Sequence, residues 1–365
     1  MNALERNQTW EIVELPKEKK TVGCKWVYAL KYKADGSLER YKARLVAKGF
    51  TQTFGIDYQE TFAPVAKMNT IRILFSLSAN LGWWMQQYDV KNVFLHEELE
   101  EEVYMDPPPG FSHSLLPNQV CRLKKALYGL KQSPRSWFER FTKAMVFMGY
   151  RQSQGDHTLF IKHSISGGVT ILIVYVDDIV ITGDVFVERD KLRKRLSTEF
   201  EIKELGKLKY FLGIEVSHSE KGIFISQQKY ILDLLKETGM VDCRPCETPI
   251  DLKHRLENDE EGATTNKGQY QRLVGKLIYL AHTRPDIAYV VSVVSQFMHN
   301  PKDSHLQVVY RLLRYLKSTP GKRILYKNHG NLNLECYTDA DYAGALIDRR
   351  STSGYSTLLG GNLVT

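Results

Sequence analysis

Two apolar runs that enclose a pair of aspartates constrain the fold of this chain more than any other feature. Residues 169–176 are mostly apolar, Asp177 and Asp178 follow, and a second apolar run ends at Gly183. Each run has the length and β-branched content of a buried strand, so we predict a β-hairpin over residues 169–182. Ionised aspartates are costly to bury and disfavour strands, and the pair therefore needs a compensating partner.

The aspartate pair admits two interpretations from the residues alone. An Asx-type turn would account for one aspartate, usually together with a glycine. Two acids between runs fit for a sheet core suit a divalent cation better, because Mg²⁺ prefers oxygen ligands and few carboxylates. Successive strand side chains point to opposite faces, so one acid is expected to be the principal ligand, and we favour Asp177.

A third acid stands in a similar setting. Asp89 ends a predicted strand over residues 85–90, and residues 91–95 turn away from it. If this strand and the hairpin are neighbours, Asp89 lies beside Asp177. Carboxylates shared by two metal ions would then suit the in-line displacement of a phosphoryl-transfer reaction. The alternative is a helix N-cap, which is the usual role of a lone aspartate at the end of a strand.

The charge balance favours a polyanionic partner. The formal net charge is +8, which points to nucleic acid or an anionic membrane surface. Residues 17–48 hold ten cations interleaved with aromatics, as phosphates and stacked bases require, although a solvated hairpin surface is the plainer alternative. No apolar stretch approaches the roughly 20 residues of a membrane span. The first residues lack the features of a secretory signal, and five cysteines argue against a disulfide framework.

Further elements follow from periodicity and turn residues. We predict strands over residues 22–32 and 41–48, joined by a tight turn at Asp35-Gly36. Helices are predicted over residues 67–81, 136–148, 186–199, 273–281, 285–298 and 304–317, and strands over 210–216, 222–226 and within 323–365. Residues 243–267 form a polar connection. This order predicts an α+β fold with three parts.

Several long motifs now identify a resemblance. They are Gln-Tyr-Asp-Val-Lys-Asn-Val-Phe-Leu-His (87–96), Glu-Glu-Val-Tyr-Met (101–105), Leu-Tyr-Gly-Leu-Lys-Gln-Ser-Pro-Arg-Ser-Trp (127–137), Tyr-Val-Asp-Asp (175–178) and Phe-Leu-Gly-Ile-Glu-Val (211–216). In this order they closely resemble the reverse transcriptase of copia-type LTR retrotransposons, which are common in plant genomes. The resemblance covers nearly the whole chain.

The resemblance implies a right-hand polymerase followed by a truncated ribonuclease H-like β segment. The fingers and palm would span residues 1–235, a helical thumb and connection 236–325, and an incomplete ribonuclease H-like start 326–365. Such an enzyme extends a primer along an RNA or DNA template with dNTPs and two Mg²⁺ or Mn²⁺ ions. The alternative is a catalytically inactive nucleic-acid-binding remnant of a decayed element. The family life cycle implies cytoplasmic particles and nuclear delivery, with no membrane partner.

The resemblance also assigns roles to matching positions. Asp89 would be the first metal-binding aspartate, and Asp177 and Asp178 the paired aspartates of the palm hairpin. Phe94 would screen the sugar 2′ position, although its residue type alone favours a core phenylalanine. The remaining nucleotide-binding positions are Lys42 and Arg44, which alternatively are surface cations, and Gly129, Lys131 and Gln132 in a loop-to-helix segment.

Two regions qualify these expectations. Asp339 resembles the first metal ligand of a ribonuclease H domain, whose other carboxylates come from later elements, so we expect no RNA-strand degradation by this polypeptide alone. The family usually has glycine where Glu97 stands, and a glutamate at a position needing φ > 0 would strain the turn after Asp89. This departure bears on activity and not on fold.

Overall fold

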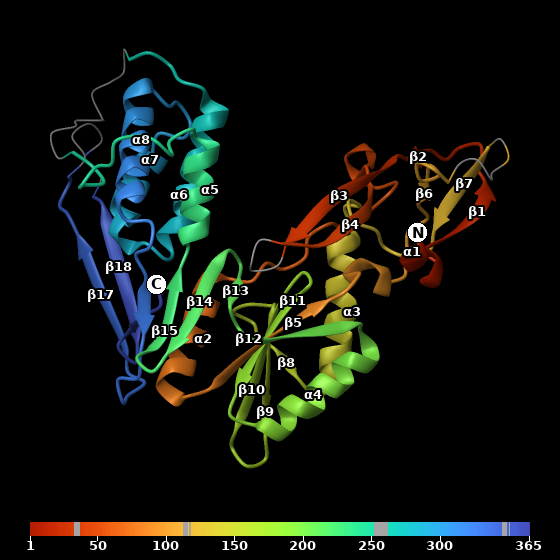
Figure 1. Cartoon of the computed structure of the whole chain (residues 1–365), viewed down its shortest axis with the longest axis horizontal. Helices are drawn as coiled ribbons and strands as arrows, with labels where there is room; N and C mark the ends of the chain where they lie inside the picture. The colour runs from red at the N-terminus through yellow and green to blue at the C-terminus, as the bar shows by residue number, and fades with distance from the viewer. Residues whose placement is uncertain (33–36, 112–115, 117, 252–261, 345–348, 350) are drawn as a thin grey trace. The chain divides into compact units, whose positions relative to one another are not determined.

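The computed structural model describes residues 1–32, 37–111, 116, 118–251, 262–344, 349 and 351–365 (Figure 1). These residues divide into two compact units. Unit 1 comprises Met1–Ala66 and Gln86–Gly206, and unit 2 comprises Lys67–Met85 and Lys207–Thr365. Both units mix helices with sheets, as the sequence predicts. The predicted turn at Asp35-Gly36 and part of the predicted polar connection, residues 252–261, lie outside the described residues.

The largest sheet of unit 1 holds the predicted aspartate hairpin. Its strand order is β12-β5-β11-β10-β9-β8. These strands are β5 (Trp84–Val90), β8 (Arg151–Gln152), β9 (Leu159–His163), β10 (Val169–Tyr175), β11 (Asp178–Gly183) and β12 (Ile202–Lys207). β10 and β11 pair antiparallel, which confirms the hairpin. Their interior residues are buried, because an apolar strand in the middle of a sheet is covered on both faces.

Two smaller sheets complete the β structure described for unit 1. One has the order β1-β7-β6-β2, with β1 (Trp10–Glu14), β2 (Thr21–Val22), β6 (Tyr104–Met105) and β7 (Gln119–Leu123). The other is a long antiparallel ribbon of β3 (Cys24–Tyr32) and β4 (Leu38–Ala47), which confirms the two predicted basic strands.

The α-helices among the described residues of unit 1 are α1 (Asn2–Arg6), α3 (Ser133–Phe147) and α4 (Phe186–Glu199). The bounds of α4 are those that the sequence predicts. α3 begins three residues before its predicted start, because Pro134 can occupy the first turn of a helix, where no backbone N–H is needed. The buried ring of Trp137 on α3 packs edge-on against Phe200, with ring centroids 5.1 Å apart.

One part of unit 2 is a four-stranded sheet of order β13-β14-β15-β16. The strands are β13 (Tyr210–Phe211), β14 (Ile214–Ser219), β15 (Gly222–Ser226) and β16 (Ile324–Tyr326). The single strand predicted over residues 210–216 is wrong. Leu212 and Gly213 have φ of 49° and 72°, and the chain reverses there so that β13 and β14 pair with each other.

Unit 2 also contains helix α2 (Met68–Leu81). This helix ends at Gly82, which has the left-handed conformation that favours glycine. Its buried Arg72, Ser76 and Asn80 are four residues apart and share one face. The Ser76 hydroxyl donates to the Leu359 carbonyl at 2.5 Å. These polar residues join α2 to the segment that contains β17 (Leu334–Ala340), β18 (Ser353–Leu359) and β19 (Asn362–Leu363).

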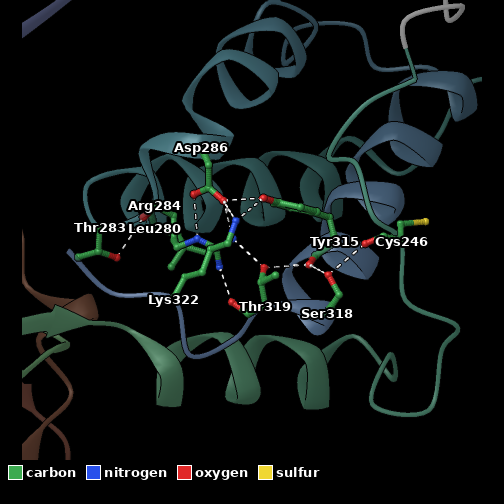
Figure 2. Close-up of polar contacts among 9 residues, drawn as sticks. All are labelled: Cys246, Leu280, Thr283, Arg284, Asp286, Tyr315, Ser318, Thr319 and Lys322. Carbon is green, nitrogen blue, oxygen red and sulfur yellow. Dashed lines mark hydrogen bonds and ion pairs between the residues drawn. The ribbon is translucent and has the colours of Figure 1, made fainter. Parts of the chain in front are cut away.

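The other helices of unit 2 share an apolar core. They are α5 (Gln228–Glu237), α6 (Lys267–Ala281), α7 (Ala288–Ser295) and α8 (Asp303–Ser318). α8 contributes Leu306, Val309, Leu313 and Leu316, whose spacing of three and four residues places them on one buried face. Between α6 and α7, a polar network centred on Arg284 and Asp286 joins the helices (Figure 2).

Two properties of the described chain bear on the composition-based expectations. None of the described helices is long and apolar enough to cross a bilayer. All five cysteines are free thiols.

Candidate active site

The β10–β11 hairpin presents its two aspartates at a tight turn. Tyr175 pairs with Asp178, so Val176 and Asp177 form the two-residue connection. Val176 has φ of 53°, which is costly for a β-branched residue. The Trp137 indole N–H donates to the Val176 carbonyl at 2.9 Å and helps to hold this turn. The aspartates are therefore displayed on a backbone whose shape is fixed by a buried helix residue.

The neighbouring strand brings the third acid to the same place. β5 lies next to β11 in the sheet, and the Val90 amide donates to the Asp177 carbonyl at 2.8 Å. The Gln87 side chain donates to Asp178 Oδ1 at 3.0 Å. Gln87 and Asp89 share one face of β5, because they are two residues apart on a strand. The predicted proximity of Asp89 to the hairpin aspartates is therefore present in the structure.

The three acids influence one another electrostatically. Burial and then the Asp177 charge raise the pKa of Asp89, whereas Lys42 lowers it. Burial raises the pKa of Asp178 to about 6, with the hydrogen bond from Gln87 opposing this and the charges of Asp177 and Asp89 adding to it. Such shifts are expected where carboxylates gather with too little positive charge to balance them.

Carboxylates in this arrangement fit a divalent cation that binds together with its substrate. No group of three potential ligands close enough to hold a metal ion occurs in the part of the chain that the structure describes. A closed protein cage is not required, because Mg²⁺ usually takes one or two carboxylates and completes its shell with waters and substrate phosphates. The oxygen donors of Asp89, Asp177 and Asp178 thus fit Mg²⁺ or Mn²⁺ bound with a phosphate.

The β3–β4 ribbon supplies the positive charge. Its register pairs Lys31 with Arg40, Ala29 with Lys42 and Val27 with Arg44. Because side chains alternate along a strand, cations and aromatics are sorted onto opposite faces. One face carries Lys25, Lys31, Arg40, Lys42 and Arg44, and the other carries Trp26, Tyr28, Leu30, Tyr41 and Leu45.

The cationic face and Asp89 act on each other electrostatically. Burial lowers the pKa of Lys42, the charges of Arg44 and Lys31 lower it further, and the charge of Asp89 raises it. A half-buried lysine among like charges is stabilised by a bound anion, which supplies the missing opposite charge. Cations opposed to metal-binding carboxylates are typical of proteins that handle phosphates.

An aromatic stack joins the ribbon to the segment after Asp89. The Arg44 guanidinium lies over the Tyr128 ring at 5.0 Å, and Tyr128 meets Phe94 edge-on with centroids 4.7 Å apart. Phe94 is 6% exposed. Sequence reasoning missed Tyr128, although it stands inside a motif quoted above. Its signal was its position directly before Gly129.

The loop before α3 is built on a close backbone approach. Gly129 has φ of 91°, and a Cβ placed there would lie 2.1 Å from the Ala47 carbonyl oxygen. The Ala47 amide donates to the Tyr128 carbonyl at 2.7 Å. Only glycine allows the loop and β4 to come this close.

We predict that Gly129→Ala destabilises unit 1 by at least about 2 kcal/mol, because both the positive φ and the clash oppose a side chain. Hydrogen exchange of the β4 amides would measure the loss. Gly167→Ala is the matched control, since Gly167 has φ of 88° with nothing within 4 Å of its added Cβ. An equal loss of stability in both variants would contradict the role of the close approach between Gly129 and the Ala47 carbonyl.

The two polar residues after Gly129 differ in their surroundings. The Lys131 ammonium donates to the Tyr58 hydroxyl at 3.2 Å and lies over its ring. The Gln132 side chain is fully buried, accepts from Gln52 Nε2 at 3.0 Å and donates to the Asp57 carbonyl at 3.1 Å. In this conformation Gln132 holds residues 52–57 in place, and Lys131 is the more accessible of the two.

The expected strain at Glu97 is absent. Glu97 has φ of −103° and ψ of 138°, which is ordinary extended backbone, so the prediction of a position needing φ > 0 is wrong. The left-handed residue in this segment is Asn92, a residue type that tolerates such a conformation. The following acids form ion pairs: Glu98 with Lys125, Glu101 with Arg135 and Glu102 with Lys19. This acidic run is therefore compatible with the fold.

Asp339 lies in unit 2, on β17 opposite Gly354. Its strand is exposed along its whole length. The metal-binding role that the resemblance implies for Asp339 stays a prediction.

Comparison with known proteins identifies the family of this chain. A family model described as reverse transcriptase (RNA-dependent DNA polymerase) matches residues 7–252. The chain is 44% identical over 361 residues to the retrovirus-related Pol polyprotein from transposon RE1 of Arabidopsis thaliana, covering 99% of this chain and 25% of that protein. It is 40% identical over 374 residues to the retrovirus-related Pol polyprotein from transposon TNT 1-94 of Nicotiana tabacum, covering 100% of this chain and 28% of that protein.

A shorter relative is the putative transposon Ty5-1 protein of Saccharomyces cerevisiae, with 35% identity over 280 residues, which are 76% of this chain and 90% of that protein. The chain belongs to the reverse transcriptase family, and its resemblance to plant copia-type Pol polyproteins is confirmed. It spans about a quarter of the length of the two plant polyproteins.

Proposed function

We propose that this chain is an RNA-directed DNA polymerase that extends a primer on an RNA or DNA template with dNTPs. The observation that supports this function best is the meeting of Asp89, Asp177 and Asp178 at one end of a sheet, with Lys42 and Arg40 of the β3–β4 ribbon acting on Asp89. In this proposal the ribbon belongs to the fingers, the six-stranded sheet is the palm, and helices α6–α8 belong to the thumb and connection.

Each set of residues has a chemical task. Mg²⁺ or Mn²⁺ held by the three aspartates would activate the primer 3′-hydroxyl and neutralise the charge that develops on the leaving pyrophosphate. Lys42 and Arg44 bind the triphosphate of the incoming nucleotide by charge-assisted hydrogen bonds. Trp137 fixes the turn that displays Asp177, and Tyr128 holds Arg44 and Phe94 in register. Catalysis then depends on positioning and electrostatics more than on covalent chemistry.

Primer extension on poly(rA)·oligo(dT), with purified protein and Mg²⁺ or Mn²⁺, tests this function. Template-dependent incorporation of dTMP is the expected result. Retention of the primer–template on a filter without any extension would instead mean a nucleic-acid-binding remnant. Failure to retain the primer–template at all would contradict both functions.

Phe94 provides a test of nucleotide selection. If its ring screens the sugar 2′ position, Phe94→Val should raise the use of UTP relative to dTTP by at least about tenfold, measured as a ratio of kcat/KM values. Phe94→Tyr keeps the ring and serves as the matched control, with an unchanged ratio. Because Phe94 packs on Tyr128, some loss of stability is expected in Phe94→Val, but a ratio of two substrates is insensitive to the folded fraction.

A further inference from the structure

A cavity of about 430 Å³ lies on the opposite side of the six-stranded sheet from the aspartates. Side chains alternate along β5, so Asp89 and Gln87 point to one face and Tyr88 points to the other. Tyr88 and the β12 residues Ile202 and Glu204 line this cavity, and α4 provides its other wall. Its volume is within the range of small-molecule sites.

The floor of the cavity contains an unsatisfied hydroxyl. Tyr88 is 0% exposed, and its hydroxyl has no hydrogen-bond partner among the residues that the structure describes. A tyrosine hydroxyl carries its proton at neutral pH and can therefore donate a hydrogen bond. A buried donor without an acceptor is unfavourable, and an acceptor supplied by a ligand would remove that cost.

The α4 wall is cationic. Arg193, Lys194, Ser197 and Thr198 line the cavity, and their spacing places them along one side of the helix. Arg193 Nη1 lies 3.3 Å from Glu204 Oε2. The Glu204 carboxylate also accepts a hydrogen bond from the Gln86 side chain. Lys194 has no ion-pair partner within the described residues. The acid is therefore already engaged, and the Lys194 ammonium is left to attract an anion.

The hydroxyls of Ser197 and Thr198 on this wall indicate which other groups a ligand should carry. Ser197 donates its hydrogen to the Arg193 carbonyl at 2.8 Å, and Thr198 donates to the Lys194 carbonyl at 3.1 Å. Each hydroxyl oxygen keeps its lone pairs for a donor from outside. A matching ligand thus carries an anionic acceptor for Lys194 and Tyr88, and hydroxyl donors for Ser197 and Thr198.

We propose that this cavity, floored by the unpartnered Tyr88 hydroxyl and walled by Lys194, Ser197 and Thr198, binds a small phosphate monoester that bears free hydroxyls, such as a sugar phosphate. The phosphate meets Lys194 and Tyr88, and the sugar hydroxyls meet Ser197 and Thr198. The site is separate from the aspartate edge, because it lies on the other face of β5.

Calorimetric titration of the full chain with ribose 5-phosphate tests this site. EDTA is present, so that no divalent cation recruits phosphate to the aspartates. We expect saturable binding with a Kd of about 0.1–1 mM. Lys194→Ala should weaken it by roughly tenfold and Tyr88→Phe by roughly three- to tenfold. Tyr88→Phe removes only a buried, unpartnered hydroxyl, so the variant is expected to fold.

Matched controls define the outcomes. Lys191→Ala removes a cation from α4 that does not line the cavity, and it should leave the affinity unchanged. Ribose should not bind, and inorganic phosphate should bind more weakly than ribose 5-phosphate. The absence of saturable binding, or binding that neither Lys194→Ala nor Tyr88→Phe weakens, overturns the proposed site. Equal affinity for phosphate and ribose 5-phosphate overturns the part assigned to Ser197 and Thr198.

Discussion

Replacing Asp177 and Asp178 together with asparagine is expected to reduce primer extension about a thousandfold or more, because divalent-cation electrostatics supply several kcal/mol of transition-state stabilisation. Asparagine keeps the size and shape of each side chain but removes the negative charge that a cation needs. Single-turnover extension of a primer on poly(rA), at saturating dTTP, is the appropriate measurement.

The control must separate lost chemistry from lost structure. Burial raises the pKa of Asp178, so its charge is unfavourable in the metal-free fold. The double variant should therefore melt no lower than the parent protein in EDTA. Asp184 is an exposed acid next to the same hairpin, and its carboxylate accepts a hydrogen bond from the Val169 amide. The Asp184→Asn variant should retain primer extension. Extension by the double variant at the parent rate would exclude these aspartates from catalysis.

The elements most visible in the sequence were those with a strong local signal. The apolar runs around Asp177 and Asp178 predict the hairpin, and the predicted bounds of α4 are those that the structure shows. The proximity of Asp89 to the hairpin was also predictable, since acids at strand ends meet when the strands are neighbours. Local residue types sufficed because the hairpin strands, α4 and β5 can each be recognised from their own residues.

Features that depend on distant segments were not predictable in the same way. The alternation of side chains along a strand predicts which face of the ribbon each cation occupies. The position of that face near Asp89, however, depends on how the ribbon packs in unit 1. The resemblance places Gln132 in a segment that borders the nucleotide and template, and in the structure its side chain is buried against Gln52 and Asp57, which stand 80 and 75 residues earlier in the chain. No local pattern indicates such a partner.

The prediction of a single strand over residues 210–216 was wrong for a different reason. Its β-rich composition predicts a strand, but Leu212 occupies a left-handed conformation that leucine rarely adopts. Pairing of β13 with β14 and the following Gly213 make this reversal possible. Tertiary pairing here overrides the preference of a single residue.

In unit 2, removing one carboxylate should have the largest effect on stability. Arg284 is 2% exposed, and its guanidinium binds Asp286 through Nε–Oδ1 and Nη2–Oδ2 at 2.9 and 2.8 Å (Figure 2). Arg284 also donates to the Thr319 carbonyl, and Tyr315 donates to Asp286 at 2.7 Å. Asp286→Ala leaves a buried cation without its counter-ion, which costs about 3–5 kcal/mol.

Hydrogen exchange of the α6, α7 and α8 amides, which reports on unit 2 separately, would measure this loss. Lys322→Ala is the matched control. Lys322 also contacts Asp286, at 3.3 Å, but it is half exposed, so its removal should cost less than about 1 kcal/mol. A comparable loss of protection in the two variants would mean that the buried Arg284 contact is not the dominant interaction.

The same network predicts a dependence on pH. Burial would raise the pKa of Asp286, but hydrogen bonds from Arg284 and Tyr315 outweigh it and hold the pKa below the usual range. The carboxylate therefore stabilises the fold above about pH 4, the ordinary value for aspartate, and this contribution is lost as the pH falls toward the lower folded-state value. The difference in stability between the parent protein and Asp286→Ala should be constant from neutral pH down to that point and should shrink below it. A difference that grows on acidification would contradict an ionised Asp286 paired with Arg284.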